Sequence, residues 1–217
     1  MQGKGSVSLN VATVGIMSAL MAVLSYASIV VPPPLGSIDA SSVLIFLVAV
    51  LYGPVIGVSV TCIGQFIGKG LLISFYGYPA VFIPGVVAVR GVEALLVGII
   101  SRKLFKGGYG LEALAMIIGV LWETVGFVIA DLYLFGAAAI TTVLTIVDLV
   151  WVPFGIAAIA YVRTAFKAEY LDEHLGILGS RTRWALLIGS LSFIVCCWIL
   201  IFLAGVMGLQ MAPLFPS

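Results

Sequence analysis

Long apolar runs fill most of the chain, and short breaks that contain proline, glycine or charged residues separate them. A helix needs about 20 apolar residues to cross the hydrocarbon core of a bilayer, and most of these runs reach that length. The pattern predicts an all-α integral membrane protein. The seven predicted helices cover about 7–31, 41–52, 55–73, 80–101, 111–135, 137–164 and 184–209.

Two of the breaks have a clear physical basis. Pro32, Pro33 and Pro34 cannot continue a helix, so 30–42 is predicted to be an ordered external loop. Asp39, Ser41 or Ser42 is then available to cap the next helix. The apolar stretch that follows is too long for one span, and Gly53-Pro54 interrupts it. The resulting helix over 41–52 is short, which favours a tilted or partly re-entrant element.

Composition excludes a soluble globular protein. The mean hydropathy is +1.28, and 9% of the residues are charged, against about 25% in ordinary soluble domains. The 217 residues leave room for six or seven spans and no separate soluble domain. The predicted organisation is a membrane bundle over 1–166, a cytoplasmic polar linker over 167–183, and an additional span with an external tail over 184–217. The apolar run 7–31 is too long for a signal-peptide core and is taken as a retained helix.

Basic residues predict the topology. Loops that stay in the cytoplasm are enriched in Lys and Arg, and eight of the ten basic residues fall in three short stretches. They are Lys4, then Arg102, Lys103 and Lys106, then Arg163, Lys167, Arg181 and Arg183. Even numbers of predicted spans separate the stretches, so the N-terminus is predicted to be cytoplasmic and the C-terminus external, in the plasma membrane of a prokaryote.

The other two basic residues and four acids lie inside predicted spans. An ionised side chain at the bilayer centre costs about 2.5–3.5 kcal/mol or more, so such residues usually face a cavity or a partner. Counting along the helices predicts overlapping depths, in one cavity open to the outer half. The predicted substrate-binding residues are Gln65, Lys69, Arg90, Glu123, Asp131 and Asp148, with Trp122 and Trp151 as rings that stack on a flat ligand.

Each of these residues also has an ordinary structural interpretation. Arg90 and Glu93 are i,i+3 neighbours and pair with each other in the simplest case. Lys69 either extends to the interface or contacts a ligand. Glu123 and Asp148 have no obvious local partner, which makes them the strongest ligand candidates. Four intramembrane acids against two bases favour a ligand with cationic or hydrogen-bond-donating character.

Several kinds of chemistry have no support in the sequence. The single histidine, His174, lies in the predicted linker, and the three cysteines lack metal-ligand spacing. The chain has no Walker-type phosphate loop and no HExxH motif. We therefore expect neither an enzyme nor a resident metal or cofactor.

Five stretches together resemble a known family. They are GIMSALMAVLSYASIVVPPP (15–34), SIDASSVLIFLVAVLYGPVIGVSVTCIGQFIGKGL (37–71), FIPGVVAVRGVEALLVGIISRKL (82–104), WETVGFVIADLYLFG (122–136) and VDLVWVPFGIAAIAYV (147–162). An Ala/Ser-rich first helix, a Pro-rich loop, an LYGP turn and a Gly-rich third helix resemble the substrate-binding S components of energy-coupling factor (ECF) vitamin transporters, over about residues 9–165.

The resemblance implies a six-helix bundle that takes a vitamin or vitamin precursor from outside and works with a membrane T subunit and two ATPases. It also implies that small residues of the first helix contact the T subunit, here Gly15, Ser18, Ala19 and Ala22. The span over 184–209 is additional to the family's six. A stand-alone ion-coupled transporter and a non-transporting scaffold subunit remain alternative readings of the same residues.

Overall fold

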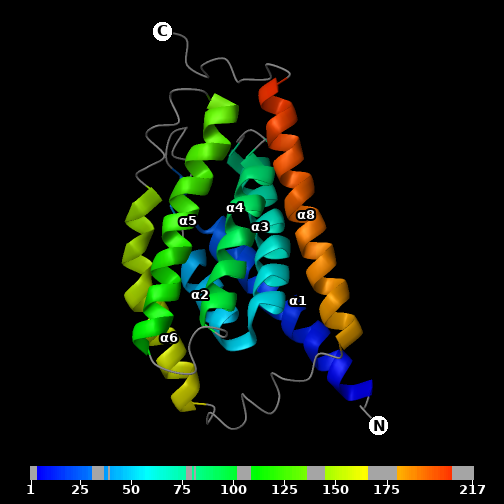
Figure 1. The fold of residues 1–217 in the computed structure, drawn as a ribbon, viewed down its shortest axis with the longest axis vertical. Coiled ribbons are helices and arrows are strands. Elements are labelled where there is room, and N and C mark those ends of the chain that lie inside the picture. Colours follow the sequence, from blue (N-terminus) through cyan, green and yellow to red (C-terminus); the bar gives the residue numbers. More distant parts are fainter. Residues whose placement is uncertain are drawn as a thin grey trace.

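The structure is a computed structural model that describes residues 4–30, 37–38, 40–76, 80, 82–101, 109–135, 145–165 and 180–206. Seven α-helices make up almost all of this part of the chain (Figure 1). They are α1 (Lys4–Tyr26), α2 (Ser41–Tyr52), α3 (Pro54–Tyr76), α4 (Phe82–Ile99), α5 (Tyr109–Phe135), α6 (Trp151–Ala165) and α8 (Ser180–Val206). The fold is the predicted all-α bundle of six helices with one more at its C-terminal side.

Consecutive helices run in opposite directions, so α1 begins at one end of the bundle and α8 finishes at the other (Figure 1). Helices α3 and α4 lie at the centre. Helix α1 packs on α3, α5 packs on α4, and α2 lies against α3, α4 and α6. Two contiguous groups of buried apolar side chains fill the interior. The first is formed by α1, α2, α3, α4, α5 and α8, and the second by α2, α4, α5 and α6.

The connection between α1 and α2 contains a small antiparallel ladder that the sequence did not predict. Strand β1 (Ile29–Val30) pairs with β2 (Ser37–Ile38), with Ile29 opposite Ile38. We call the end of the bundle where α1 finishes and α2 starts the hairpin end, and the opposite end the basic end. The prolines between the strands and Asp39 lie outside the described residues.

The first turn of α2 corrects the capping prediction. Ala40 is the N-cap and makes no side-chain capping bond, and Ser41 and Ser42 are the first two helical residues. The helix ends at Tyr52, where Gly53 has a φ of 86°, a left-handed conformation that favours glycine. Pro54 then opens α3, since the first turn of a helix needs no N–H donor from it.

The helix predicted over 137–164 is shorter than expected. Residues 145–150 form a 3₁₀ turn, and α6 starts at Trp151. Pro153 is the third residue of α6, a position where its missing N–H leaves no intrahelical bond unmade. The 3₁₀ turn matters for the site because Asp148 lies in it.

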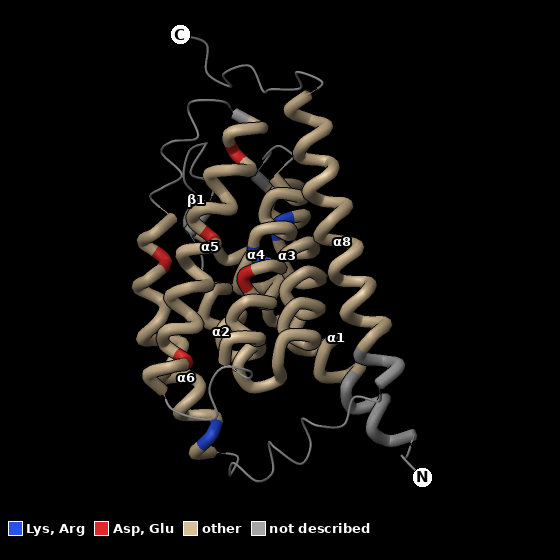
Figure 2. The backbone as a smooth tube through the Cα atoms, in the orientation of Figure 1, with Lys and Arg blue, Asp and Glu red and all other residues tan. Residues whose placement is uncertain are grey.

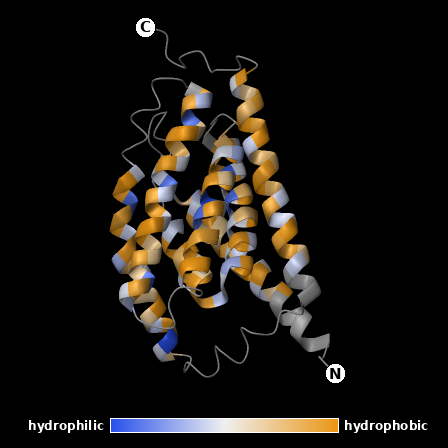
Figure 3. Cartoon of the chain, viewed as in Figure 1, coloured by the Kyte–Doolittle hydropathy of each residue, from blue (hydrophilic) through white to orange (hydrophobic). Residues whose placement is uncertain are grey.

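Within the described ranges, five helices are long and apolar enough to cross a membrane. These candidate spans are Pro54–Phe75, Phe82–Ile99, Tyr109–Leu134, Thr145–Ala165 and Trp184–Val206. The apolar parts of α1 and α2, Val11–Tyr26 and Ser41–Tyr52, are shorter. The outward faces of the long helices are mostly apolar (Figure 3), and charged positions are sparse along all of the described helices (Figure 2).

Helix α8 packs against α3, α4 and α5 through one face. Ile194, Cys197 and Ile201 are buried there, and the Ser190 hydroxyl lies 3.1 Å from that of Ser59 on α3. Gly91 of α4 allows this close approach, because a Cβ there would lie 2.8 Å from Ile194 Cδ1. Helix α8 is therefore closely packed against the rest of the bundle.

We expect Ile201→Ala to lower the midpoint of thermal unfolding in detergent, because Ile201 is 1% exposed and its truncation leaves a cavity. Such truncations cost about 2–5 kcal/mol in protein interiors. Ile199→Ala is the matched control, since Ile199 lies on the same helix and is 51% exposed. Equal midpoints for the two variants would contradict the packing described here.

Candidate functional site

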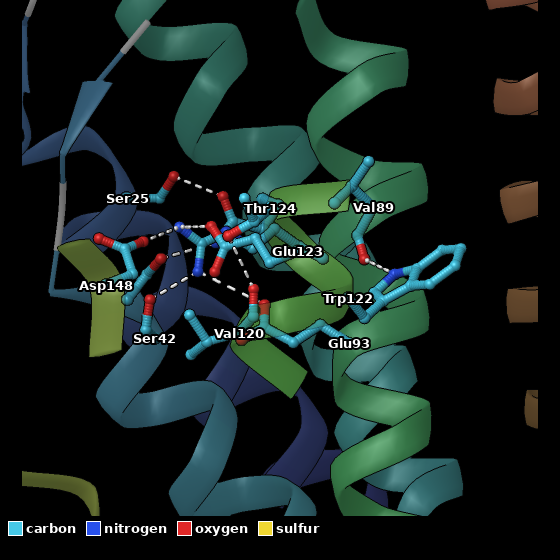
Figure 4. Close-up of polar contacts among 12 residues, drawn as sticks. Ser25, Ser42, Val89, Glu93, Val120, Trp122, Glu123, Thr124 and Asp148 are labelled. Carbon is cyan, nitrogen blue, oxygen red and sulfur yellow. Dashed lines mark hydrogen bonds and ion pairs between the residues drawn. The ribbon is translucent and has the colours of Figure 1, made fainter. Parts of the chain in front are cut away.

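One arginine and three carboxylates meet in the interior of the bundle. We call Arg90, Glu93, Glu123, Asp148 and the hydroxyl of Ser42 the Arg90 cluster (Figure 4). Its four ionisable side chains belong to residues that are each no more than 4% exposed. They come from α4, α5 and the 3₁₀ turn before α6, while Ser42 comes from the first turn of α2.

Arg90 is the centre of these contacts. Its Nη1 donates to Ser42 Oγ at 2.5 Å and lies 3.4 Å from Glu93 Oε2. Its Nη2 donates to Asp148 Oδ2 at 3.1 Å and lies 2.7 Å from Glu123 Oε1. The predicted pairing of Arg90 with Glu93 is thus present. The structure adds Glu123 and Asp148, which lie far away in sequence and share the same guanidinium.

The bonding of Glu123 is incomplete among the described residues. Its Oε1 forms the ion pair with Arg90, but neither of its carboxyl oxygens accepts a hydrogen bond from a described group. The carboxyl group also neighbours that of Glu93 and lies within hydrogen-bonding reach of that of Asp148. Buried polar atoms are nearly always hydrogen-bonded in native proteins, so an open carboxyl group at 1% exposure points to an additional binding partner.

A second polar network adjoins the Arg90 cluster. The Gln65 side chain accepts from the Ser25 hydroxyl at 2.7 Å and donates to Ser41 Oγ at 2.8 Å. Lys69 Nζ donates to the backbone carbonyl of Ser25 at 3.3 Å. Since Ser41 and Ser42 are consecutive, the first turn of α2 connects this network, which ties α1 to α3, with the Arg90 cluster.

The predicted site residues therefore form two groups that meet at α2. Asp131 lies eight residues after Glu123 on α5, about 12 Å further along the helix axis. It is 5% exposed, as is Lys69, and both have partners within the protein. Lys69 is thus buried and does not extend to the interface.

The two predicted stacking tryptophans have different surroundings. The Trp122 ring points away from the cluster, and its indole N–H donates to the Val89 carbonyl at 3.2 Å (Figure 4). Trp151 packs beside Phe154, with ring centroids 5.8 Å apart. Its buried indole N–H finds no hydrogen-bond acceptor among the described residues. Of the two, only Trp151 keeps a polar group open to a ligand.

The small residues of α1 divide between two faces. Ser18 and Ala22 are buried against α3, where a Cβ at Gly68 would lie 2.6 Å from the Ala22 carbonyl oxygen. Gly15 and Ala19 are exposed. The structure thus leaves only Gly15 and Ala19 of the predicted set accessible to another protein.

Sequence reasoning missed the serines that hold the site. Ser25, Ser41 and Ser42 are all completely buried, and each accepts or donates a hydrogen bond to a charged or amide side chain. Serines in apolar helices usually donate to a backbone carbonyl of their own helix, as Ser59 and Ser74 do. No sequence signal distinguishes the three site serines from these two.

An ion pair of a different kind closes the basic end. Arg163, in the last turn of α6, donates to both carboxylate oxygens of Glu112 in the first turn of α5, at 2.6 and 3.0 Å. The guanidinium also lies 5.9 Å from the centroid of the Tyr109 ring. The structure thus assigns Arg163, predicted as a topology signal, a second role in joining α5 to α6.

Comparison with protein families matches the chain to the ECF-type riboflavin transporter S component over residues 6–166. The match covers more than half of the 217 residues and includes every member of the Arg90 cluster. The chain belongs to this family. It is a multi-pass membrane S component of the ECF transporters, a class of transporter subunits and not of enzymes. Comparison with curated proteins finds no match.

The family match ends before α8, so the S component consists of the six-helix bundle of its family and one additional helix. The two polar networks lie wholly in the shared part, between α1, α2, α3, α4, α5 and the 3₁₀ turn. Among the described residues no group of histidine, cysteine, aspartate and glutamate side chains is arranged to hold a metal ion.

Proposed function

We propose that this S component captures a small water-soluble vitamin or vitamin precursor from outside the cell for ATP-driven uptake by an ECF complex. The observation that supports this most directly is the Arg90 cluster with its open Glu123 carboxyl group. Ligand sites are mostly apolar with a few polar groups that fix orientation, and the cluster supplies such groups inside an apolar bundle.

The position of the cluster supports access from the hairpin end. Arg90 lies eight residues into α4, about 12 Å from that helix's outermost residue at this end. Its partner Ser42 lies in the first turn of α2, so α2 starts well inside the bundle. The connection that contains β1 and β2 then lies on the outer side of the cluster, where it can cover a bound ligand.

We further propose that the hairpin end faces outside and the basic end the cytoplasm. We also propose that the T subunit contacts the exposed face of α1 that carries Gly15 and Ala19. Small residues allow close backbone approach between helices in lipid. The sequence has no Walker-type loop, so ATP acts through two separate ATPase subunits.

The test is a thermal-shift assay of the purified full chain against water-soluble vitamins and their precursors, with riboflavin as the first probe. A ligand at a hundredfold excess over its Kd stabilises a protein by about 2.7 kcal/mol. We expect at least one probe to raise the unfolding midpoint, and Glu123→Gln and Asp148→Asn to abolish that rise.

The matched control is Glu112→Gln, which removes another buried carboxylate, 5% exposed, from an ion pair at the basic end. It should keep the ligand-induced rise. Substrate uptake that requires a proton gradient and does not require the ATPases would contradict the proposal. It would favour a stand-alone transporter. Loss of stability in the site variants, with no ligand found for the folded parent, would favour a scaffold role.

A further inference from the structure

Helices α1 and α3 run in the same direction and meet in a fixed register (Figure 1). A Cβ at Gly64 of α3 would collide with the side chain of Met21 on α1. Further along, a Cβ at Gly68 would lie 2.8 Å from Ser25 Cβ. The two contacts are about one helical turn apart on both helices. Positions one turn earlier on each helix therefore face each other as well.

Those earlier positions hold two buried hydroxyl groups. Ser18 lies three residues before Met21 and is 3% exposed. Thr61 lies three residues before Gly64 and is completely buried. Among the residues that the structure describes, neither hydroxyl has a hydrogen-bond partner, so the two do not bond to each other. Buried polar atoms in native proteins nearly always have a partner, and a bound water serves where no protein group is within reach.

Other hydroxyl groups in the apolar helices are satisfied within their own helix. Ser59 donates at 2.9 Å and Thr124 at 3.0 Å to the backbone carbonyl four residues earlier. In the described part of the chain, Ser18 and Thr61 make no such bond. The contact between α1 and α3 thus contains two hydroxyls that need an additional donor or acceptor.

A third polar group on this side of α3 is only partly satisfied. Gln65 lies four residues after Thr61 and so shares its face of the helix. Its Nε2 donates to Ser41 Oγ at 2.8 Å and also lies 3.8 Å from Met21 Sδ. A thioether sulfur is a weak acceptor, so the second N–H of this amide favours a stronger one. This observation is independent of the two hydroxyls and points to the same place.

We propose that α1 and α3 enclose a bound water molecule that bridges the hydroxyls of Ser18 and Thr61. Water fits because it both donates and accepts, and because a buried water needs only two to four polar partners. The uncharged hydroxyls offer no charge that would hold an ion. The bridge extends the network of Gln65 along the contact toward the basic end. It gives Ser18 a role inside the protein and does not depend on the proposed function.

Radiolytic labelling of the full chain in detergent tests for this water. A short X-ray exposure converts water into hydroxyl radicals, which oxidise a neighbouring methionine to its sulfoxide. Met21 adjoins the proposed water, whereas Met116 lies in the apolar group formed by α2, α4, α5 and α6. Both methionines are 0% exposed, so bulk water reaches neither. We expect Met21 to be oxidised several times faster than Met116, as measured by mass spectrometry of the digested protein.

A variant of Thr61 links the label to the bridge. Thr61→Val removes the hydroxyl and keeps the shape of the side chain. We expect it to reduce the oxidation of Met21 to the level of Met116, and to lower the unfolding midpoint by about 2–4 °C through the loss of a hydrogen bond. The matched control is Thr124→Val, at another buried threonine whose hydroxyl bonds within its own helix. It should leave the oxidation of Met21 unchanged.

Three results would overturn the proposal. The first is oxidation of Met21 no faster than that of Met116, whatever the stability of the variants. The second is undiminished oxidation of Met21 in Thr61→Val, which would place the water elsewhere. The third is a higher unfolding midpoint in Thr61→Val, since valine then replaces a hydroxyl that has no partner at all.

Discussion

Replacing Arg90 with methionine is expected to lower the stability of the bundle by about 3–5 kcal/mol, because it leaves buried carboxylates without their counter-charge. Arg90 is the group that Glu93, Glu123 and Asp148 share, so one substitution breaks three ion pairs. Methionine replaces the stem of the side chain as far as the position of Nε and has a similar overall volume. The loss then reflects charge and not volume. The measurement is the thermal unfolding midpoint in detergent.

Two further variants separate this cause from others. Arg163→Met removes the guanidinium of the pair at the basic end, where the side chain is 32% exposed, and exposed pairs contribute about 0–1 kcal/mol. We expect a much smaller shift for it. Combining Arg90→Met with Glu93→Gln, Glu123→Gln and Asp148→Asn should restore much of the stability, since no unpaired charge remains. An unfolding midpoint of the combined variant below that of Arg90→Met would contradict the explanation by charge.

The helices were predictable because their boundaries depend on local chemistry. The segment 41–52 was predicted from Gly53-Pro54 and matches α2. The exceptions are the end of α1, which stops at Tyr26 and not at 31, and the start of α6, which begins at Trp151 and not at 137. The prediction placed a helix across the 3₁₀ turn because apolar residues continue through it. The 3₁₀ turn and the two-residue strands are too short for a repeating pattern of hydrophobic residues to be recognised in the sequence.

The site was predicted in depth but not in direction. Counting residues placed Trp122 and Glu123 at the level of Arg90, and the Glu123 carboxylate does meet that arginine. Consecutive residues on a helix point about 100° apart, since a turn takes 3.6 residues, so both could not face one group. Glu123 faces Arg90, and Trp122 bonds to Val89 on another side. Which of the two faces inward depends on how α5 packs on α4, and that is a property of the whole fold.

The partners of Glu123 and Asp148 were unpredictable for the same reason. Local spacing finds Glu93 as the partner of Arg90, and it finds none for the other two acids. Their absence of local partners made them ligand candidates, and in the structure they contact the same arginine. The two interpretations are compatible, because one guanidinium cannot neutralise three carboxylates. The candidate ligand-binding residues and the structural ion cluster are thus the same groups. A substitution of either acid that is made to test ligand binding also changes the internal charge balance.

Replacing Gly68 with leucine is expected to separate α1 from α3 and to abolish ligand binding. A Cβ at this position would lie 2.6 Å from the Ala22 carbonyl oxygen and 2.8 Å from Ser25 Cβ. Since the first of these is a backbone atom, α1 has to move as a whole. That movement breaks the hydrogen bond that Ser25 donates to Gln65 and the one that it accepts from Lys69. Gln65 also bonds to Ser41 in the first turn of α2, so the connection from α1 to the Arg90 cluster is lost as well. Overpacking costs about 1–3 kcal/mol, and the lost polar bonds add to it.

The matched control lies two residues further on the same helix. A Cβ at Gly70 meets nothing within 4 Å, so Gly70→Leu adds the same side chain without a collision. We expect its unfolding midpoint and ligand-induced shift to match those of the parent, and those of Gly68→Leu to fall. Gly68→Ala should lie between them, because it introduces the colliding Cβ alone. If Gly68→Leu unfolds earlier and yet binds ligand with unchanged affinity, then α1 contributes packing only, and the path from α1 to the cluster through Gln65 and Ser41 has no role in binding.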